Sequence, residues 1–296
     1  MTASDQAPPL HEDVRSIVEI EEVGPDRFSG RTPPSPVGRV FGGIVVAQAL
    51  MAAQRSVGPS GAAGGSDGVP ALRLHSLHGY FLNRALPDSE VSFSVEPLRD
   101  SRSFALRQVT TVQSGEPRAR FLCSFHIDEQ GETDYQLAPP TAIEPPDAIA
   151  PSGGPMLFDI RVAERVPSGD GTYLSSGRHW VRVKDPFPDD PALHLCLLGY
   201  FSDQTRLSFR PYTEEAWGTH TDASLDHAVW FHRPARADRW LRYELQALSA
   251  RGNRASVRGL MYDEDGALVM SMAQELLVRP IPGAEPQVPP WRLGAS

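Results

Sequence analysis

The second half of this 296-residue chain repeats the strand and turn pattern of the first half at an offset of 150 residues. The segments that align in this way are 77–81 with 227–231, 91–95 with 241–245 and, after a gap of one residue, 121–123 with 272–274. A duplicated fold keeps such a pattern even where few residues are identical. The repeat therefore predicts two copies of one fold, which can be compared position by position.

Composition and charge narrow the class of protein. The chain is 40% apolar and 22% charged, as is typical of globular proteins, and its net charge of −9 comes from scattered acidic residues. This argues against nucleic acid or an anionic membrane as the main partner. Cys123 and Cys196 lie in apolar runs without metal-ligand spacing, which indicates buried thiols in a reducing compartment. With no signal-peptide pattern and no bilayer-spanning run, we expect a cytoplasmic protein without membrane insertion.

Each half contains one apolar helix followed by a run of strands. The predicted helices are 44–55, which Phe41-Gly42-Gly43 opens, and 191–201. A helix without a polar face is buried on most sides, and its small residues let a sheet curve closely around it. Alternation predicts strands at 16–23, 72–83, 91–98, 103–113 and 118–127, and then at 157–163, 178–183, 224–232, 240–249, 254–263 and 267–278. A Gly- and Ser-rich segment, 58–70, is predicted to be a mobile loop.

Six prolines within residues 136–155 mark a semi-extended linker between the halves. We therefore expect an N-terminal repeat over 14–135 and a C-terminal repeat over 156–280. Each repeat is an α+β unit in which a curved antiparallel sheet surrounds a central helix, the hot-dog arrangement. Two such units in one chain can pair their sheets, so the predicted fold is a double hot-dog.

Polar residues of the second half that align with apolar residues of the first are candidate site residues. Gln274 is the polar member of an otherwise apolar row on the last strand, and a buried amide left without partners costs about 1–3 kcal/mol. Asp203 ends the second helix, where the helix dipole and poor solvation raise a carboxyl pKa. Ser224 begins the next strand. The first-half counterparts of Asp203, Ser224 and Gln274 are Ala53, Leu74 and Cys123.

Each of these residues also has a structural explanation: a surface helix end for Asp203, a strand-edge hydroxyl for Ser224 and a satisfied core amide for Gln274. Their occurrence together in equivalent positions favours one shared site in the C-terminal repeat.

The chain resembles the type II acyl-CoA thioesterases, which are double hot-dog enzymes, over about residues 15–279. The motifs that carry the resemblance are 39–43 (RVFGG), 46–50 (VAQAL), 75–82 (HSLHGYFL), 98–104 (LRDSRSF), 198–203 (LGYFSD) and 225–234 (LDHAVWFHRP). The resemblance implies an active site of Asp203, Ser224 and Gln274, where the family often has threonine in place of the serine. His78 is followed by Gly79-Tyr80-Phe81, where the family commonly continues with Pro-Gly, so the acyl preference is open.

The expected chemistry is hydrolysis of acyl-CoA to a free acid and CoA without a metal or cofactor. Asp203 would accept a proton from a water held by Ser224 and Gln274. The backbone N–H groups of Gly42 and Gly43, at the start of the first helix, would bind the carbonyl oxygen, although tight helix entry explains these glycines as well.

His75 is the remaining predicted substrate-binding residue, with a structural role in its strand as the alternative. A non-catalytic acyl-CoA-binding or regulatory protein and a hot-dog hydratase remain alternatives for the whole chain. An exposed sheet edge predicts a homo-oligomer, either a dimer or a tetramer.

Overall fold

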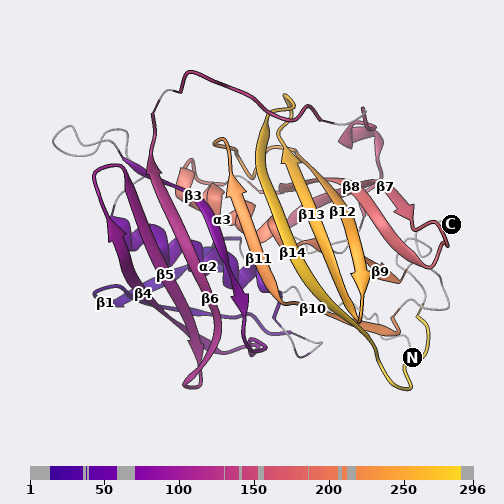
Figure 1. Ribbon diagram of the computed structural model, residues 1–296, viewed down its shortest axis with the longest axis horizontal. Helices are drawn as coiled ribbons and strands as arrows, with labels where there is room; N and C mark the ends of the chain where they lie inside the picture. The colour runs from indigo at the N-terminus through magenta and orange to yellow at the C-terminus, as the bar shows by residue number, and fades with distance from the viewer. Residues whose placement is uncertain are drawn as a thin grey trace.

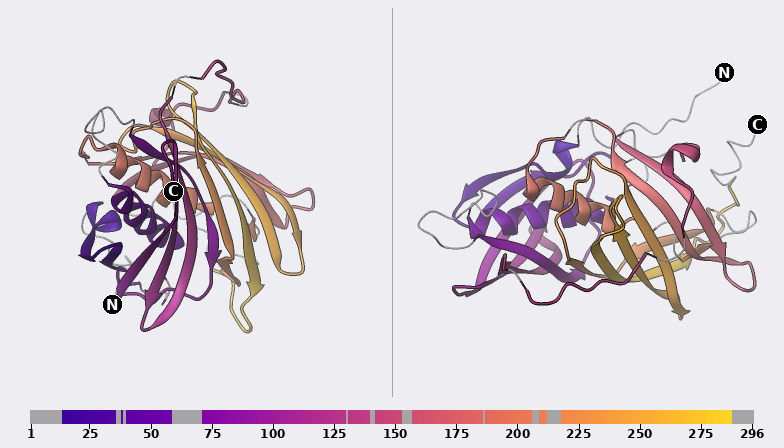
Figure 2. Two further views of the ribbon diagram at one scale, coloured as in Figure 1. Left: turned by 60° about the vertical axis from the view of Figure 1, so that its left-hand side comes forward. Right: turned by 90° about the horizontal axis from the view of Figure 1, so that it is seen from above.

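Strands from both halves of the chain form one continuous sheet, and the two long helices lie on the same side of it (Figures 1 and 2). The computed structural model describes residues 14–35, 38, 40–58, 71–129, 131–139, 142–152, 157–185, 187–205, 209–211 and 218–287. Within these residues the order of the paired strands is β1-β2-β4-β5-β6-β3-β11-β14-β13-β12-β8-β7.

The first repeat consists of α1 Arg15–Val18, β1 Ile20–Gly24, β2 Arg27–Arg31, α2 Gly42–Val57, β3 Leu72–Phe81, β4 Glu90–Asp100, β5 Phe104–Gln113 and β6 Glu116–Ile127. After the short helix η2 Pro146–Ala148, the second consists of β7 Phe158–Pro167, β8 Tyr173–Val183, α3 Pro191–Ser202, β9 Arg210–Pro211, β10 His220–Ser224, β11 Asp226–Phe231, β12 Leu241–Arg251, β13 Arg254–Tyr262 and β14 Leu268–Pro280. The strand order of the second repeat mirrors that of the first. This is the predicted double hot-dog.

Two strand predictions are wrong in detail. Residues 16–23 do not form one strand, because α1 precedes β1 there. Ile17 and Val18 are both buried, and adjacent residues of a strand point to opposite faces, so a helical turn accommodates the pair better. The predicted strand 224–232 is interrupted at Leu225, which separates β10 from β11. The backbone N–H of Leu225 donates to the carbonyl of Glu275. Residues 59–70 of the predicted loop lie outside the described residues.

The two repeats join through strands β3 and β11 and through helices α2 and α3. In the antiparallel β3–β11 pair, Leu77 lies opposite Val229 and His78 opposite Ala228. The helices approach closely at Gly199, because a side chain there would overlap Leu50 and press on Val46 of α2. Every residue from Gly43 to Ala53 is buried, as the alanine-rich apolar sequence of this helix predicts. The helices thus form a shared core beneath the joined sheets.

The segment between the repeats crosses one end of the molecule from β6 to β7 (Figure 1). Some of its described residues form hydrogen bonds with the second repeat. The Gln136 side chain donates to the Gly266 carbonyl and accepts from the Leu268 N–H. The Trp180 indole donates to the Glu144 carbonyl 3.0 Å away. The boundaries predicted for this linker remain a prediction. Its described part is held against the second repeat by these hydrogen bonds.

Strand register supports the position-by-position equivalence of the repeats. Leu74 pairs with Phe125 in the first repeat, and Ser224 pairs with Leu276 in the second. These pairs agree with the offset of 150 residues and the single-residue gap read from the sequence. The positions compared between the halves are therefore equivalent in the fold as well.

We expect Gly79→Ala to destabilise the protein by about 2 kcal/mol or more, since overpacking against a fixed backbone costs roughly 1–3 kcal/mol. A methyl group at Gly79 of β3 would overlap the carbonyl oxygen of Arg120 and the ring of Phe121. Urea unfolding measures the change. Gly24→Ala in β1 is the matched control, because nothing lies within 4 Å of the added atom. Equal unfolding midpoints for the two variants would contradict the close packing of β3 against β6 at Gly79.

Candidate active site

Two polar side chains of the second repeat converge on one carboxylate oxygen of a third, Asp203. Asp203 caps the C-terminus of α3, and its side chain is buried. Its Oδ1 atom accepts a hydrogen bond from the Ser224 hydroxyl at 3.0 Å and another from the Gln274 amide nitrogen at 2.7 Å. Ser224 ends β10, and Gln274 lies on the buried face of β14, as the alternation of that strand predicted. The structure therefore brings the three predicted residues together.

The environment of Asp203 makes it a stronger base than an ordinary aspartate. Its pKa is raised from 3.8 to about 6 because burial disfavours the charged form. The hydrogen bonds from Gln274 and Ser224 lower the pKa, Asp222 raises it, and a bond from the Gly43 backbone lowers it. Burial is the largest of these effects, and the donors keep the carboxylate available at neutral pH.

The start of α2, in the first repeat, completes the site. Gly42 lies so close to Asp203 that an added Cβ would be 2.7 Å from the carboxylate Oδ2 atom and 3.1 Å from the Phe81 ring. A Cβ at Gly43 would meet the Tyr200 carbonyl and the Phe41 ring. Both glycines are therefore required for close approach. The positive end of the α2 dipole faces the carboxylate at the negative end of α3, so the site is shared between the repeats.

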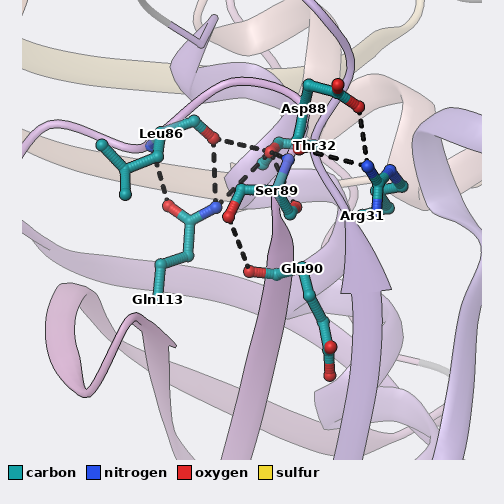
Figure 3. Close-up of polar contacts among 7 residues, drawn as sticks. All are labelled: Arg31, Thr32, Leu86, Asp88, Ser89, Glu90 and Gln113. Atoms are coloured by element: carbon teal, nitrogen blue, oxygen red, sulfur yellow. Dashed lines mark hydrogen bonds and ion pairs between the residues drawn. The ribbon is translucent and has the colours of Figure 1, made fainter.

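A polar cluster lies between the end of β2 and the segment that joins β3 to β4 in the first repeat (Figure 3). The Gln113 amide accepts from the Leu86 N–H at 2.8 Å and donates to the Leu86 carbonyl at 3.1 Å. The Thr32 hydroxyl lies 2.6 Å from the Leu86 carbonyl and 2.9 Å from that of Ser89. The cluster thereby holds Thr32, the residue after β2, against the segment between β3 and β4.

A further group of buried polar residues adjoins the three, and the sequence analysis did not select it. The Nε2 atom of His227 lies 2.7 Å from the Ser202 hydroxyl, and the Tyr243 hydroxyl donates to the Ser202 carbonyl at 2.8 Å. Burial lowers the pKa of His227 to about 3, so its ring is neutral at physiological pH. Burial, reinforced by the charge of Asp203, raises the pKa of Tyr243 well above 10.

The comparison of the halves contains a signal for these residues too. The six polar residues and their first-repeat counterparts are Ser202 and Ala52, Asp203 and Ala53, Ser224 and Leu74, His227 and Leu77, Tyr243 and Phe93, and Gln274 and Cys123. In every pair a polar side chain replaces an apolar one. Applied to whole strands, the same comparison would have found His227 and Tyr243.

His75 lies elsewhere. It occupies an irregularity of β3 between Leu74 and Ser76, and burial, then His126 and then His78, lower its pKa. His78 and His126 belong to the face of the sheet opposite the buried residues Leu77 and Phe125. The structure thus groups His75 with these histidines and not with Asp203.

Neither a metal cluster nor a membrane-spanning helix occurs in the described part of the chain. Among those residues, no group of three or more His, Cys, Asp or Glu side chains could hold a metal ion. No described helix is long and apolar enough to cross a membrane.

Known proteins share both halves of this architecture. A profile described as acyl-CoA thioesterase matches residues 156–277, and one described as acyl-CoA thioesterase N-terminal domain matches residues 31–126. Human acyl-coenzyme A thioesterase 8 is 31% identical over 306 residues, covering 93% of this chain and 90% of the human protein.

Solved structures of similar proteins have the same fold. The acyl-CoA thioesterase II TesB2 from Mycobacterium marinum is 34% identical with a TM-score of 0.76, covering 92% of this chain and all (100%) of that one. A hot-dog protein of unknown function from Alicyclobacillus acidocaldarius, 17% identical, has the same fold with a TM-score of 0.72, over 90% of this chain and 98% of its own. The fold and these relatives thus define a double hot-dog thioester hydrolase. The chain belongs to the acyl-CoA thioesterase family, in its type II branch.

The raised pKa of Asp203 makes a prediction about stability. A folded-state pKa of about 6 against 3.8 unfolded means that the folded state binds the proton more tightly. The ionised carboxylate therefore destabilises the fold above pH 6, by at most roughly 3 kcal/mol. Asp203→Asn removes this penalty, so we expect it to be more stable than wild type by about 1–3 kcal/mol at pH 8.

The stability gained by Asp203→Asn should shrink as the pH falls from 6 towards 4, because the wild-type carboxyl is then protonated and also uncharged. Urea unfolding at a series of pH values measures it. Parallel stability curves for the two proteins would contradict the shifted pKa.

Proposed function

We propose that this protein hydrolyses acyl-CoA by a water that Asp203 activates, with Ser224 and Gln274 holding the reacting groups in place. The observation that carries the proposal is the convergence of the Ser224 hydroxyl and the Gln274 amide on one oxygen of a buried carboxylate. A carboxylate with a raised pKa, beside two fixed polar groups, is suited to accept a proton from a bound water. Family membership supports acyl-CoA as the substrate.

The proposed reaction has two steps. The water oxygen attacks the thioester carbonyl carbon while Asp203 takes the water proton, which gives a tetrahedral oxyanion. The carbonyl then re-forms, the carbon–sulfur bond breaks, and the proton on Asp203 passes to the departing CoA thiolate. The products are a carboxylic acid and free CoA, and Asp203 regains its charge. Ser224 and Gln274 restrict the position of the water, which lowers the entropic part of the barrier.

The start of α2 is the proposed binding site for the oxyanion. Helix N-termini offer backbone N–H groups and a positive dipole to negative charge. The Gly43 backbone already hydrogen-bonds to Asp203, so of the two predicted donors we assign the oxyanion to Gly42. The absence of a side chain at Gly42 lets the substrate carbonyl approach Asp203 closely.

The assembly and location of the protein form a further part of the proposal. Large apolar side chains that remain exposed on β3, β6 and β11 (Tyr80, Leu122 and Trp230) are consistent with a homo-oligomer. Both cysteines are buried and free, which fits a reducing compartment such as the cytoplasm. An enzyme that releases fatty acids from CoA would serve lipid metabolism.

We expect Asp203→Asn to lower kcat by about 100- to 10,000-fold, the range found when a general base is removed. The assay detects released CoA with a thiol reagent across acyl-CoA substrates of increasing chain length. Wild-type turnover that disappears in the variant supports the proposed base. Binding without turnover by the wild type would favour the acyl-CoA-binding alternative, and formation of a hydroxyacyl-CoA from an enoyl-CoA would favour a hydratase.

Ser224 provides a matched pair of variants. Ser224→Ala removes the hydroxyl that donates to Asp203, and we expect kcat to fall by about 10- to 100-fold. Ser224→Thr keeps the hydroxyl, and we expect it to retain most of the activity. Comparable losses in both variants would show that steric fit at this position matters more than the hydroxyl.

The pH profile tests the protonation state of Asp203. Since the pKa of Asp203 is about 6 and the base must be ionised, kcat/KM should fall below about pH 6. The residual activity of Asp203→Asn should lack this acid limb. A profile that stays flat down to pH 4.5, near the ordinary carboxyl pKa, would exclude Asp203 as the base.

A further inference from the structure

Two buried polar atoms beside Asp203 belong to residues that lie opposite each other in the sheet. As the side chains lie, the Nδ1 atom of His227 and the Oε1 atom of Gln274 have no hydrogen-bond partner among the described residues. Strand register places the two residues opposite each other, one position beyond the Ala228–Ala273 pair. The Gln274 side chain is nevertheless close enough to raise the pKa of His227 against the effect of burial. An acceptor oxygen has this effect, because it favours the ring state that carries more protons.

The position of the ring proton follows from counting donors and acceptors. The Ser202 hydroxyl has one proton and lies 2.7 Å both from the Gly199 carbonyl and from His227 Nε2. If Nε2 carries the proton of the neutral ring, Nδ1 and Gln274 Oε1 are two buried acceptors with no proton between them. If Nδ1 carries it, the ring donates to Oε1 and accepts the Ser202 proton, which then leaves the Gly199 carbonyl, so one acceptor loses its donor where the other tautomer leaves two without one. Buried acceptors are costly to leave unpaired, so the Nδ1–H form is favoured.

The orientation of the Gln274 amide then depends on both of its neighbours. Asp203 offers an acceptor, to which the amide NH₂ group donates at 2.7 Å. A rotated amide would turn its oxygen towards that carboxylate and its NH₂ group towards a ring N–H. Donor would then meet donor, and acceptor would meet acceptor. A ring that donates from Nδ1 therefore permits one orientation of the amide.

We infer that His227, supported by Ser202, is a positioning residue that holds the Gln274 amide with its NH₂ group towards the reacting water and Asp203. This inference rests on the proposed function and extends it to a residue that does not itself react. In the first repeat, Leu77 and Cys123 occupy the equivalent positions, so the fold does not require a histidine here.

Steady-state kinetics of two substitutions test the role. His227→Leu places at this position the residue found at its counterpart, and we expect a fall in kcat of about 100-fold, as for a misplaced reacting group, with little change in KM. His227→Asn retains an NH₂ group that can donate to Gln274, so we expect it to recover much of the loss. Wild-type kcat in His227→Leu, or equal losses in both variants, would overturn the inference.

His194→Asn is the control for removing a buried imidazole from this repeat. His194 lies in the first turn of α3, at the far end of the helix from Asp203, and accepts from the Ala237 N–H, which an asparagine oxygen can replace. We expect its kcat to equal that of the wild type. Thermal unfolding of all variants confirms that they fold.

The coupling between His227 and Gln274 is measured by a double-mutant cycle. In a Gln274→Ala background the further change His227→Leu should alter kcat by less than about twofold, because the amide that it positions is gone. Independent, multiplicative losses would show that His227 acts by another route.

A measurement without substrate separates this inference from the proposed function. Long-range hydrogen–nitrogen correlation NMR identifies which ring nitrogen carries the proton. We expect the Nδ1–H tautomer of His227 at neutral pH, and the Nε2–H tautomer would overturn the positioning role. Absence of acyl-CoA hydrolysis by the wild type would instead refute the proposed function, while the tautomer would still decide the hydrogen bond to Gln274.

Discussion

The site depends on a carboxylate buried between two helix ends. Asp203 lies where α3 terminates, and α2 begins against it at Gly42 and Gly43. This contact requires the helices of the two repeats to lie side by side, which the β3–β11 pairing and the close approach at Gly199 ensure. Without the first repeat, Asp203 would lack the helix dipole and the backbone donor that face its carboxylate. The joined sheet is thus a condition for the chemistry as well as for stability.

The first repeat shows why one site is present and not two. At the position equivalent to Gln274 it has Cys123, and the buried Arg107 is paired with Cys123 in the sheet. Arg107 donates to Ser56 of α2, at 3.0 Å, and forms an ion pair with Asp100. A carboxylate in place of Ala53, one turn before the end of α2, would lie close to this guanidinium and be held ionised, with a depressed pKa. Such a group is a poor base, so replacing Ala53 with aspartate would not restore a second site.

Sequence comparison located the residues whose chemistry differs between the repeats, but not those whose direction depends on backbone irregularities. Asp203, Ser224 and Gln274 were found because their counterparts are apolar. His227 and Tyr243 meet the same criterion but lie inside apolar strand patterns, where their partners become visible only after folding. The direction of His75 could not be read from the alternation of its strand, because it lies at an irregularity of β3 and a one-residue change of register moves a side chain to the other face. Ile17 and Val18 read as strand because a single helical turn is too short to show its period.

The raised pKa of Asp203 and the orientation of Gln274 are two aspects of one balance. Burial alone would raise the pKa further and leave the base protonated, whereas each donor stabilises the ionised form and makes the carboxylate less basic. Ser224, Gln274 and the Gly43 backbone together bring the pKa to about 6, below neutral pH yet well above 3.8. If the Gln274 amide rotated, its oxygen would face the carboxylate, the pKa would rise, and less of the base would be ionised. In the proposed mechanism, a neutral histidine that fixes this amide would therefore control both the position of the water and the fraction of enzyme that can activate it.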